Sequence, residues 1–562
     1  MNETNDAQGV SRETLVDLDI VEKLGVLPIL LEDRTRPRKG KEAKRNIVWG
    51  TDSYAALGEK YQADAPIERE TLDELQKNED YLFLPRAQKE LDERRLRSKK
   101  RAEVFTPNWV CNLMNEFCDA EWLRRADKFD VAREPRALLV DDYDWSRSKS
   151  RKWKRYVDSR RLEITCGEAP FIVSRYDASN GRLLPLDERN GILDRKLRVV
   201  DKNVAREDES EWFKWTLRAF QSVYGYEFQG DNLLVARLNL FLTFTDYYRD
   251  RGFRVDPERD DFDKVLPSAE YAQKIAEAIA YNFWQMDGLT NRVIYPKIEP
   301  SLFDNAPDDA PDEPPRQGVL FDGATARTPS NPKKNRVARR DASPAAPFAI
   351  IRNWRAGSGY GEAVVFNDLK KRERRRMKFD YIVGNPPYQE EIEGNTRARP
   401  VYNNFMDQCY EIGTKVLLIT PGRFLTESGF TPSEWDKKML SDEHLMVLWS
   451  QPNSEKIFKD TDIKGGVVIT FRDADKVFGA IGTFFRYEEL KSIYSKVMNS
   501  GEFISFSNIV FGYNQWNVTT LFAEYPELRR TRNVKKISSS ALMDIPFVTE
   551  TGGVGITWSL SA

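Results

Sequence analysis

The chain has 562 residues, 40% of them hydrophobic and 12% aromatic, which is enough for several domains and a large buried core. Its formal net charge of −2 does not indicate nucleic-acid binding by the chain as a whole, and we expect its local basic runs to be solvated faces. A single histidine, His444, and four cysteines without metal-ligand spacing argue against Ser-His-Asp hydrolysis, zinc chemistry and any metal site.

The first 100 residues are charged and mixed in character, and they contain no motif that we can interpret. The polar N-terminus has no signal-peptide pattern, and no apolar run in the chain approaches membrane-spanning length. We therefore expect a soluble, cytoplasmic protein that begins with an N-terminal extension.

A helix is predicted directly after Phe105. Thr106 is a good N-cap and Pro107 suits the first helical position, and apolar residues follow at helical spacing between residues 109 and 117. The backbone N–H groups at such a helix start can bind a carboxylate. An ordinary capped helix that packs on a sheet explains the same residues.

Two acids stand at the ends of predicted strands. Residues 223–228 indicate a short strand that ends in an acid, Glu227, and a long apolar helix follows at 232–248. An acid at the end of the second strand of a Rossmann sheet can accept hydrogen bonds from ribose hydroxyls, whereas a capping or surface glutamate is the simpler interpretation. Residues 280–287 indicate a third strand, which ends at Asp287.

The stretch 379–388 is the most informative part of the sequence. Its apolar start predicts a buried parallel strand. Pro386 and Pro387 cannot continue a strand ladder, so the chain turns at the carboxyl end of this strand, where open α/β sheets bind ligands. Asn385 and Tyr388 then offer hydrogen-bond acceptors and an aromatic face to a planar ring with an amino group, unless the prolines only end the strand.

Further elements are predicted beyond this stretch. They are a helix at 402–411 and strands at 415–420, 445–449 and 466–471. Together with the earlier elements they predict an α/β protein. Phe458 precedes the last of these strands and is either a core residue or part of the wall of a site. The pattern of strands fades beyond residue 476.

Asn-Pro-Pro-Tyr after a strand resembles the signature of amino-methyltransferases that use S-adenosylmethionine. Together with Phe-Thr-Pro before a helix, it makes the chain look like a DNA adenine-N6 methyltransferase of the restriction–modification type. The resemblance covers residues 103–475 apart from a linker. It implies a Rossmann-like S-adenosylmethionine-dependent methyltransferase sheet, with an N-terminal extension and a short C-terminal α+β region.

The resemblance also implies how the cofactor is held. Phe105, Thr106 and Pro107 would grip its methionine end. Residues 161–177 resemble the family motif that joins the first strand to its helix. The residues that match this motif are Glu163, Cys166, Gly167 and Phe171. Ala169 stands where the family has a glycine, which would allow a close backbone approach or a positive φ.

The acids at the strand ends have roles in the same family. Glu227 matches the acid that binds the ribose of the cofactor. Asp287 matches the acid that binds its adenine, and Asp368 competes for this role because it lies shortly before the Asn-Pro-Pro-Tyr motif.

The resemblance places the target adenine in a pocket outside the duplex, since its amino group is inaccessible inside the base stack. Asn385 and the Pro386 carbonyl would accept the two amino protons, and Pro387 completes the turn. Tyr388 and Phe458 would stack on the base.

Five segments and several partners follow from this interpretation. The segments are the extension 1–100, the cofactor half 101–297, a disordered linker 298–347, the catalytic half 348–475 and a partial target-recognition region 476–562. The extension either packs on the core or contacts DNA. The expected partner is double-stranded DNA, with a cognate restriction endonuclease or specificity subunit as a further candidate. In the linker, Gln317 to Phe321 resembles the peptide that docks bacterial proteins on the sliding clamp.

Two other classes of protein stay open. A protein-glutamine or RNA methyltransferase would share Asn-Pro-Pro-Tyr, although Phe-Thr-Pro and the C-terminal extension favour DNA. A non-catalytic DNA-binding or partner-binding module with a decayed cofactor site is the other, suggested by Ala169 and the short C-terminal region.

Overall fold

The computed structural model describes residues 16–36, 44–77, 85, 106–125, 129, 138–146, 151–253, 265–294, 346–357, 359–371, 377–390, 398–458 and 463–499. The chain divides into two compact units, 1–484 and 485–562. In the second unit the described residues form one helix, α14 (Glu488–Met498). Within the described ranges no helix is long and apolar enough to cross a membrane. Phe105, the peptide 317–321 and the linker up to residue 345 lie outside these ranges, so the expectations for them stay predictions.

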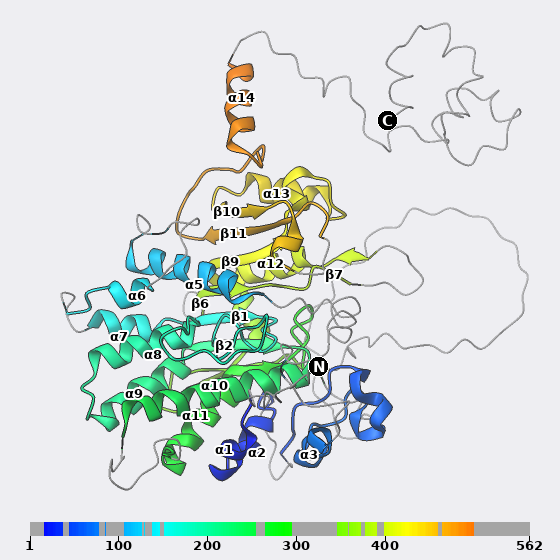
Figure 1. The fold of residues 1–562 in the computed structure, drawn as a ribbon. Coiled ribbons are helices and arrows are strands. Elements are labelled where there is room, and N and C mark those ends of the chain that lie inside the picture. The colour runs from blue at the N-terminus through cyan, green and yellow to red at the C-terminus, as the bar shows by residue number, and fades with distance from the viewer. Residues whose placement is uncertain are drawn as a thin grey trace, which may run out of the picture. The chain divides into compact units, whose positions relative to one another are not determined.

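A seven-stranded sheet forms the centre of the first unit (Figure 1). Its strands are β1 (Arg161–Ile164), β2 (Val223–Glu227), β3 (Phe283–Gln285), β6 (Phe379–Gly384), β9 (Gly413–Pro421), β10 (Leu445–Gln451) and β11 (Val467–Asp473). The order across the sheet is β10-β11-β9-β6-β1-β2-β3. Neighbouring strands from β3 to β9 are parallel, and β11 runs antiparallel to both of its neighbours. The strands that the sequence predicts are all present.

The strand order reverses between β1 and β6. The chain adds β2 and β3 on one side of β1 and then returns to place β6 and β9 on the other side. At such a switch point the loops that follow the two central strands leave a crevice at the carboxyl end of the sheet. Residues 165–171 follow β1 there, and residues 385–388 follow β6.

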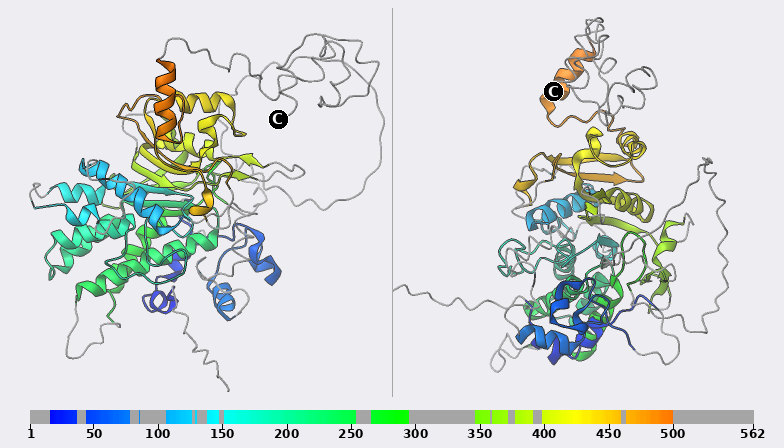
Figure 2. Two further views of the ribbon diagram at one scale, coloured as in Figure 1. Left: turned by 45° about the horizontal axis from the view of Figure 1, so that its top comes forward. Right: turned by 90° about the vertical axis from the view of Figure 1, so that its right-hand side faces the viewer.

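Helices cover both faces of the sheet (Figures 1 and 2). The helices that pack in one apolar cluster are α5 (Asn108–Leu123), α7 (Arg151–Asp158), α8 (Ile192–Asn203), α9 (Glu209–Phe220), α10 (Gly230–Arg251) and α11 (Ala269–Asn282). Those in the other cluster are η6 (Phe366–Lys370), α12 (Tyr402–Ile412) and α13 (Ser433–Ser441). Side chains of β9 alternate between the two, since Leu417 and Ile419 enter the first cluster and Val416 and Leu418 the second.

Shorter elements complete the described residues. They are α1 (Leu18–Lys23), α2 (Leu27–Leu31), η1 (Asp52–Leu57), η2 (Glu59–Tyr61), α3 (Arg69–Lys77), α6 (Leu139–Asp142), β4 (Ile350–Asn353), β5 (Glu362–Val365), β7 (Gln389–Glu390), β8 (Arg399–Pro400), η7 (Gly422–Thr426) and η8 (Ser454–Lys456). The strands β4 and β5 pair with each other, as do β7 and β8, outside the central sheet.

The described part of the N-terminal extension packs on the core. Arg237 of α10 is fully buried and donates to the carbonyls of Leu30 (2.6 Å), Glu32 (3.0 Å) and Phe283 (2.6 Å). Burial lowers the pKa of Arg237 to about 10, so the side chain is still a cation at neutral pH. Its hydrogen bonds join the extension to the edge of the sheet at β3.

Two elements begin later than the sequence predicts. The helix α5 begins at Asn108, and Pro107 rather than Thr106 is its N-cap. The Pro107 carbonyl accepts the first helical hydrogen bonds, and proline has no N–H of its own that needs a cap. The strand β3 begins only at Phe283, because α11 continues to Asn282. The Asn282 side chain donates to the carbonyls of Phe220 (3.0 Å) and Val223 (2.9 Å).

Candidate functional site

The loop with Asn385 continues directly from β6 at the switch point. Gly384, at the end of β6, pairs with Ile164 at the end of β1. A Cβ atom on Gly384 would lie 2.6 Å from Ile164 Cγ1 and 3.0 Å from its carbonyl oxygen, so this approach requires glycine. The Thr165 hydroxyl then donates to the Asn385 carbonyl (3.3 Å). Close packing of the two strand ends therefore fixes where the loop starts.

Polar atoms of this loop are shielded from solvent. Both Asn385 Oδ1 and the Tyr388 hydroxyl oxygen are buried. The Tyr388 hydroxyl has no hydrogen-bond partner within the described ranges, and burial raises its pKa, so it stays protonated. A buried hydroxyl without a protein partner is unusual and is a donor that a ligand can use.

Phe458 lies against Tyr388. The ring centroids are 6.4 Å apart with an angle of 68° between the planes. The short helix η8 follows β10, and Phe458 lies two residues beyond η8. Its N–H donates to the Ser454 carbonyl (2.8 Å). Because the rings meet edge to face, a planar base can stack between them only after one ring turns.

The loop after β1 has a strained backbone. Thr165, Gly167 and Ala169 all have positive φ, of 42°, 53° and 62°, and only glycine adopts this conformation without cost. Ala169 is completely buried, and its N–H donates to the Cys166 carbonyl (2.7 Å). The position where the family has glycine is therefore left-handed in this chain too, with alanine in it.

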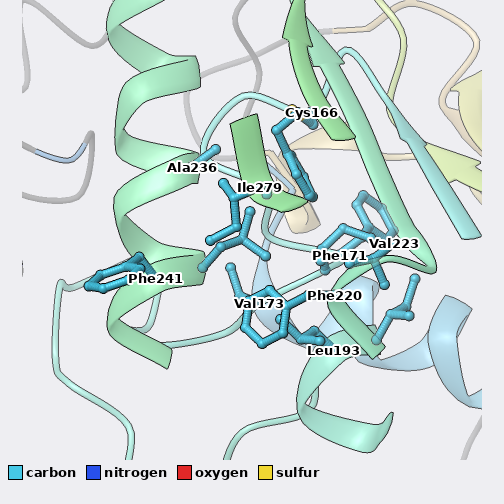
Figure 3. Close-up of a cluster of buried hydrophobic side chains, with 14 of the residues drawn as sticks. Cys166, Phe171, Val173, Leu193, Phe220, Val223, Ala236, Phe241 and Ile279 are labelled. Atoms are coloured by element: carbon cyan, nitrogen blue, oxygen red, sulfur yellow. The ribbon is translucent and has the colours of Figure 1, made fainter. Parts of the chain in front are cut away.

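Glu163 of β1 holds the shape of this loop. Its carboxylate accepts the N–H groups of Phe171 (3.4 Å) and Ile172 (3.1 Å). Burial raises the pKa of Glu163 well above its ordinary value, although the two N–H bonds oppose the shift. The side chains of Cys166 and Phe171 lie in the first apolar cluster (Figure 3), so these motif residues support the loop from inside the core.

Glu227 joins the loops that follow β1 and β2. One carboxylate oxygen accepts the Gly167 N–H (2.8 Å), and the other accepts the Gln229 N–H (3.0 Å). The residue is 7% exposed. Its carboxylate is therefore oriented at the glycine of the β1 loop, at the carboxyl edge of the sheet.

Asp287 lies two residues beyond β3 and closes its own turn. Its carboxylate accepts the Leu289 N–H (2.8 Å) and the Thr290 hydroxyl (3.0 Å). Asp368 pairs with Lys371 (2.7 Å) and belongs to η6, which does not follow a strand of the central sheet. Asp287 therefore lies just beyond a strand of the central sheet, whereas Asp368 does not.

Two asparagines of α5 contact the chain that follows β1. Asn115 of α5 donates to the Phe171 carbonyl (2.9 Å), and Asn108 donates to the Tyr176 carbonyl (3.0 Å). Thr106 is buried. Burial raises the pKa of the Cys111 thiol, and the nearby charge of Glu163 raises it further. Asn115 therefore joins α5 to the β1 loop, and Asn108 joins its first turn to the segment beyond that loop.

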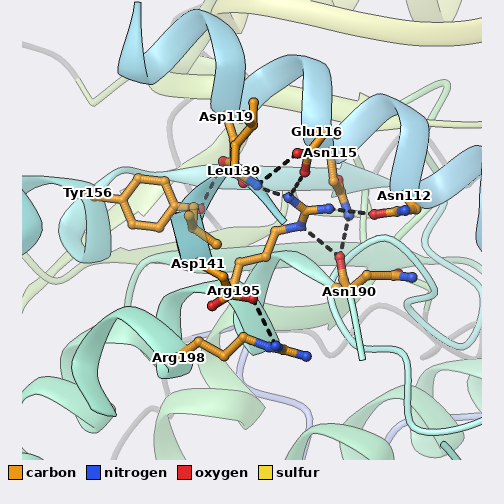
Figure 4. Close-up of polar contacts among 12 residues, drawn as sticks. Asn112, Asn115, Glu116, Asp119, Leu139, Asp141, Tyr156, Asn190, Arg195 and Arg198 are labelled. Carbon is orange, nitrogen blue, oxygen red and sulfur yellow. Dashed lines mark hydrogen bonds and ion pairs between the residues drawn. The ribbon is translucent and has the colours of Figure 1, made fainter. Parts of the chain in front are cut away.

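A buried ionic network holds α5 against α8 and β1 (Figure 4). Arg195 of α8 donates to Asp119 (2.8 Å), to Glu116 and to the Asn112 side chain (2.6 Å). The side chains of Arg195 and Asp119 have no exposed surface. Asp119 also pairs with Arg161 of β1 (3.1 Å). The network thereby connects α5 both to α8 and to the central sheet.

Sequence reasoning missed two residues that shape the site. Thr165 joins the β1 loop to the β6 loop, and Gln229 supplies an N–H to Glu227. Thr165 acts between segments that are far apart in the chain, so no local pattern identifies it. Gln229 lies only two residues after Glu227, but a backbone N–H group carries no signal in the sequence.

The fold and the site define a class of protein. A mostly parallel seven-stranded sheet in which β11 is antiparallel to both of its neighbours, with helices on both faces, is the Rossmann-like methyltransferase fold. Residues 221–458 match the family model of the Eco57I restriction-modification methylase. This part of the chain is therefore a methylase domain of the restriction–modification type, which implies a methyl donor and DNA as substrate. A search of curated proteins finds no match to the chain.

Proposed function

We propose that this protein transfers a methyl group from S-adenosylmethionine to the exocyclic N6 of adenine in a specific DNA sequence. It acts as the modification component of a restriction–modification system, and a cytoplasmic location is part of the same proposal. The loop 385–388 carries the proposal, because it holds a buried amide oxygen and a buried hydroxyl at the switch point beside the β1 loop. The match of residues 221–458 supports DNA as the substrate.

The residues around the β1 loop suit the cofactor. The backbone of Gly167 can approach a ligand closely, because it is left-handed and carries no side chain. Glu227 presents a carboxylate beside it, the group that binds ribose hydroxyls. Thr106 and Pro107 directly precede the helix α5, and the N–H groups at the start of that helix suit the carboxylate of a methionine moiety. When bound, the cofactor supplies a methyl group on a positively charged sulfur.

The loop after β6 prepares the amino nitrogen of the base. Asn385 Oδ1 and the Pro386 carbonyl accept its two protons, which localises the nitrogen lone pair that is otherwise delocalised into the ring. Pro387 keeps the turn rigid, so these acceptors are in place before the reaction. Correct orientation then supplies much of the acceleration. No general base is required, because the proton can leave after the methyl group has been transferred.

Tyr388 and Phe458 hold the base by stacking. Their rings contact each other edge to face in this structure, so base entry requires that they separate. The Tyr388 hydroxyl then has a polar group of the nucleic acid as a partner. A base outside the duplex is the substrate that suits such a buried aromatic pair.

Substitution of Asn385 tests the proposal. Asn385→Ala should reduce methylation of DNA by at least about a hundredfold, in the range for loss of a preorganised polar group, while calorimetry shows nearly unchanged S-adenosylmethionine binding. Asn203→Ala is the matched control, because Asn203 lies at the far end of α8 and donates to the Val199 carbonyl (2.8 Å). Methylation by Asn385→Ala at a rate near that of the wild type would show that the loop has another role.

The nature of the product tests the substrate. DNA, RNA and a release-factor-like protein are each incubated with radiolabelled S-adenosylmethionine, and labelled DNA is digested to nucleosides for mass spectrometry. We expect label in DNA alone, as N6-methyladenine. Label in RNA or in protein glutamine identifies one of the alternative methyltransferases, and N4-methylcytosine corrects the target base.

A further inference from the structure

A segment of the N-terminal extension lies directly on the turn between β2 and α10. Gly50 and Gly230 mark where the two backbones touch. A Cβ atom on Gly50 would lie 2.6 Å from the Phe228 carbonyl oxygen, and one on Gly230 would lie 2.0 Å from the Val48 carbonyl oxygen. Both distances are shorter than any real Cβ contact, so the approach requires a glycine on each side.

Gln285, the last residue of β3, fastens the two backbones together. Its side-chain oxygen accepts the Val48 N–H (2.9 Å), and its amide nitrogen donates to the carbonyls of Val48 (2.8 Å) and Phe228 (2.9 Å). The side chain is buried, and it pairs with Val48 as the backbone of a neighbouring strand would. The extension is thus joined to the carboxyl edge of the sheet.

Side chains of the extension also reach the turn. The Thr51 hydroxyl donates to the Gln229 side chain (3.1 Å), and the Tyr54 hydroxyl donates to the Asp231 carboxylate (3.3 Å). Tyr54 packs on Trp49, which is almost completely buried. These contacts flank the Gln229 N–H group that orients Glu227. The extension therefore contacts the residues that immediately follow the proposed ribose-binding acid.

We infer that residues 48–54 are a positioning element of the cofactor site, because they clamp the turn 228–231 and thereby fix Glu227 for the cofactor ribose. The inference rests on the proposed function, since it assigns to the extension a role in binding S-adenosylmethionine. Residues 48–54 act through Glu227 and its turn. Nothing in the inference requires them to touch the cofactor.

Calorimetry with S-adenosylmethionine and the full-length protein tests this inference. Gly50→Ala should bind the cofactor at least about tenfold more weakly, because a displaced turn misplaces the acid. The milder double variant Thr51→Val/Tyr54→Phe removes two hydroxyl contacts and should weaken binding several-fold. Gly25→Ala is the matched control. It lies in the same extension with a φ of 67° and has open space around its Cβ position, so it strains the backbone without pressing on the turn.

Steady-state kinetics separate a positioning role from general destabilisation. The KM for S-adenosylmethionine should rise in the two variants of the clamp, while the KM for DNA stays the same and Gly25→Ala changes neither. Equal cofactor affinity in the wild type and in both clamp variants overturns this inference and leaves the proposed function intact. No binding by the wild type overturns the proposed function, and the inference with it.

Discussion

Replacement of Arg195 by methionine should remove the buried cation that holds α5 against α8. Methionine fills a similar volume but leaves Glu116 and Asp119 without one of their partners. Asp119 retains Arg161 at 3.1 Å and the Tyr156 hydroxyl at 2.8 Å. Glu116 retains the Leu139 N–H at 2.8 Å. Breaking a buried ion pair costs about 3–5 kcal/mol, and because Asp119 remains paired we expect a value near the lower limit.

Urea unfolding of the full-length protein, followed by tryptophan fluorescence, measures this loss. Arg182→Met is the control, because Arg182 and Glu188 form a pair (2.7 Å) whose side chains are 54% and 48% exposed, and we expect unchanged stability. A loss below about 1 kcal/mol for Arg195→Met would refute the reasoning, since it would mean that water or a rearrangement replaces the guanidinium in the network.

The network should also matter for function. Asn115 lies between Asn112 and Glu116 on α5 and holds the β1 loop through the Phe171 carbonyl. If α5 shifts, Thr106 and Pro107 shift with it. In a preparation of Arg195→Met that is still folded, the KM for S-adenosylmethionine should therefore rise more than the KM for DNA. Equal changes in both constants would indicate a general loss of structure instead.

Three further substitutions test single features of the site. Because burial raises the pKa of Glu163, the folded state binds its proton more tightly than the unfolded state, and the free energy of unfolding falls as the pH rises above about 4.3. Glu163→Gln should remove that slope in urea titrations at pH 5 and pH 7.5, and parallel profiles would contradict the assignment. Ala169→Gly relieves about 1–2 kcal/mol of left-handed strain but loses a buried methyl group worth about 0.8 kcal/mol and gains unfolded-state entropy of about 0.4–1 kcal/mol. The changes nearly cancel, so stability should be unchanged, whereas Ala236→Gly inside α10 should destabilise by about 2 kcal/mol, from helix propensity and the loss of a buried methyl group. Tyr388→Phe should keep the wild-type melting temperature, because the hydroxyl has no partner within the described ranges, and should raise the KM for DNA several-fold; a lower melting temperature with an unchanged KM would contradict the proposed contact.

The strands around the site could be predicted because their apolar runs are short and end where the sequence pattern changes. The run before Asn385 ends in two prolines, and the run 223–227 ends in an acid followed by a helix. What each acid contacts could not be predicted. Glu163 turns toward Ile172 and Glu227 toward Gly167, and these choices depend on the shape of a loop that no local pattern specifies.

The contacts of the N-terminal extension with the core could not be predicted from the sequence. Gly50 and Gly230 carry no signal separately, because a glycine does not indicate which backbone approaches it. Only the fold shows that Gly50 approaches the Phe228 carbonyl and that Gly230 approaches the Val48 carbonyl, although the two segments are far apart in the chain. Glutamine is likewise a residue type that is usually exposed, yet the Gln285 side chain is buried and hydrogen-bonds to the Val48 backbone.

The family match begins at residue 221, but the site does not. The strand β1 stands between β2 and β6 in the sheet, and the loop after it supplies Gly167 and Thr165 to the proposed cofactor and catalytic loops. A fragment restricted to residues 221–458 would lack this central strand, the helix α5 and the segment 48–54. It would expose the edges of β2 and β6, which need a partner on that side. The matched stretch therefore contains all of the proposed catalytic residues without being able to assemble their site. Methyl transfer should require the N-terminal third of the chain even though none of the target-binding residues lies in it.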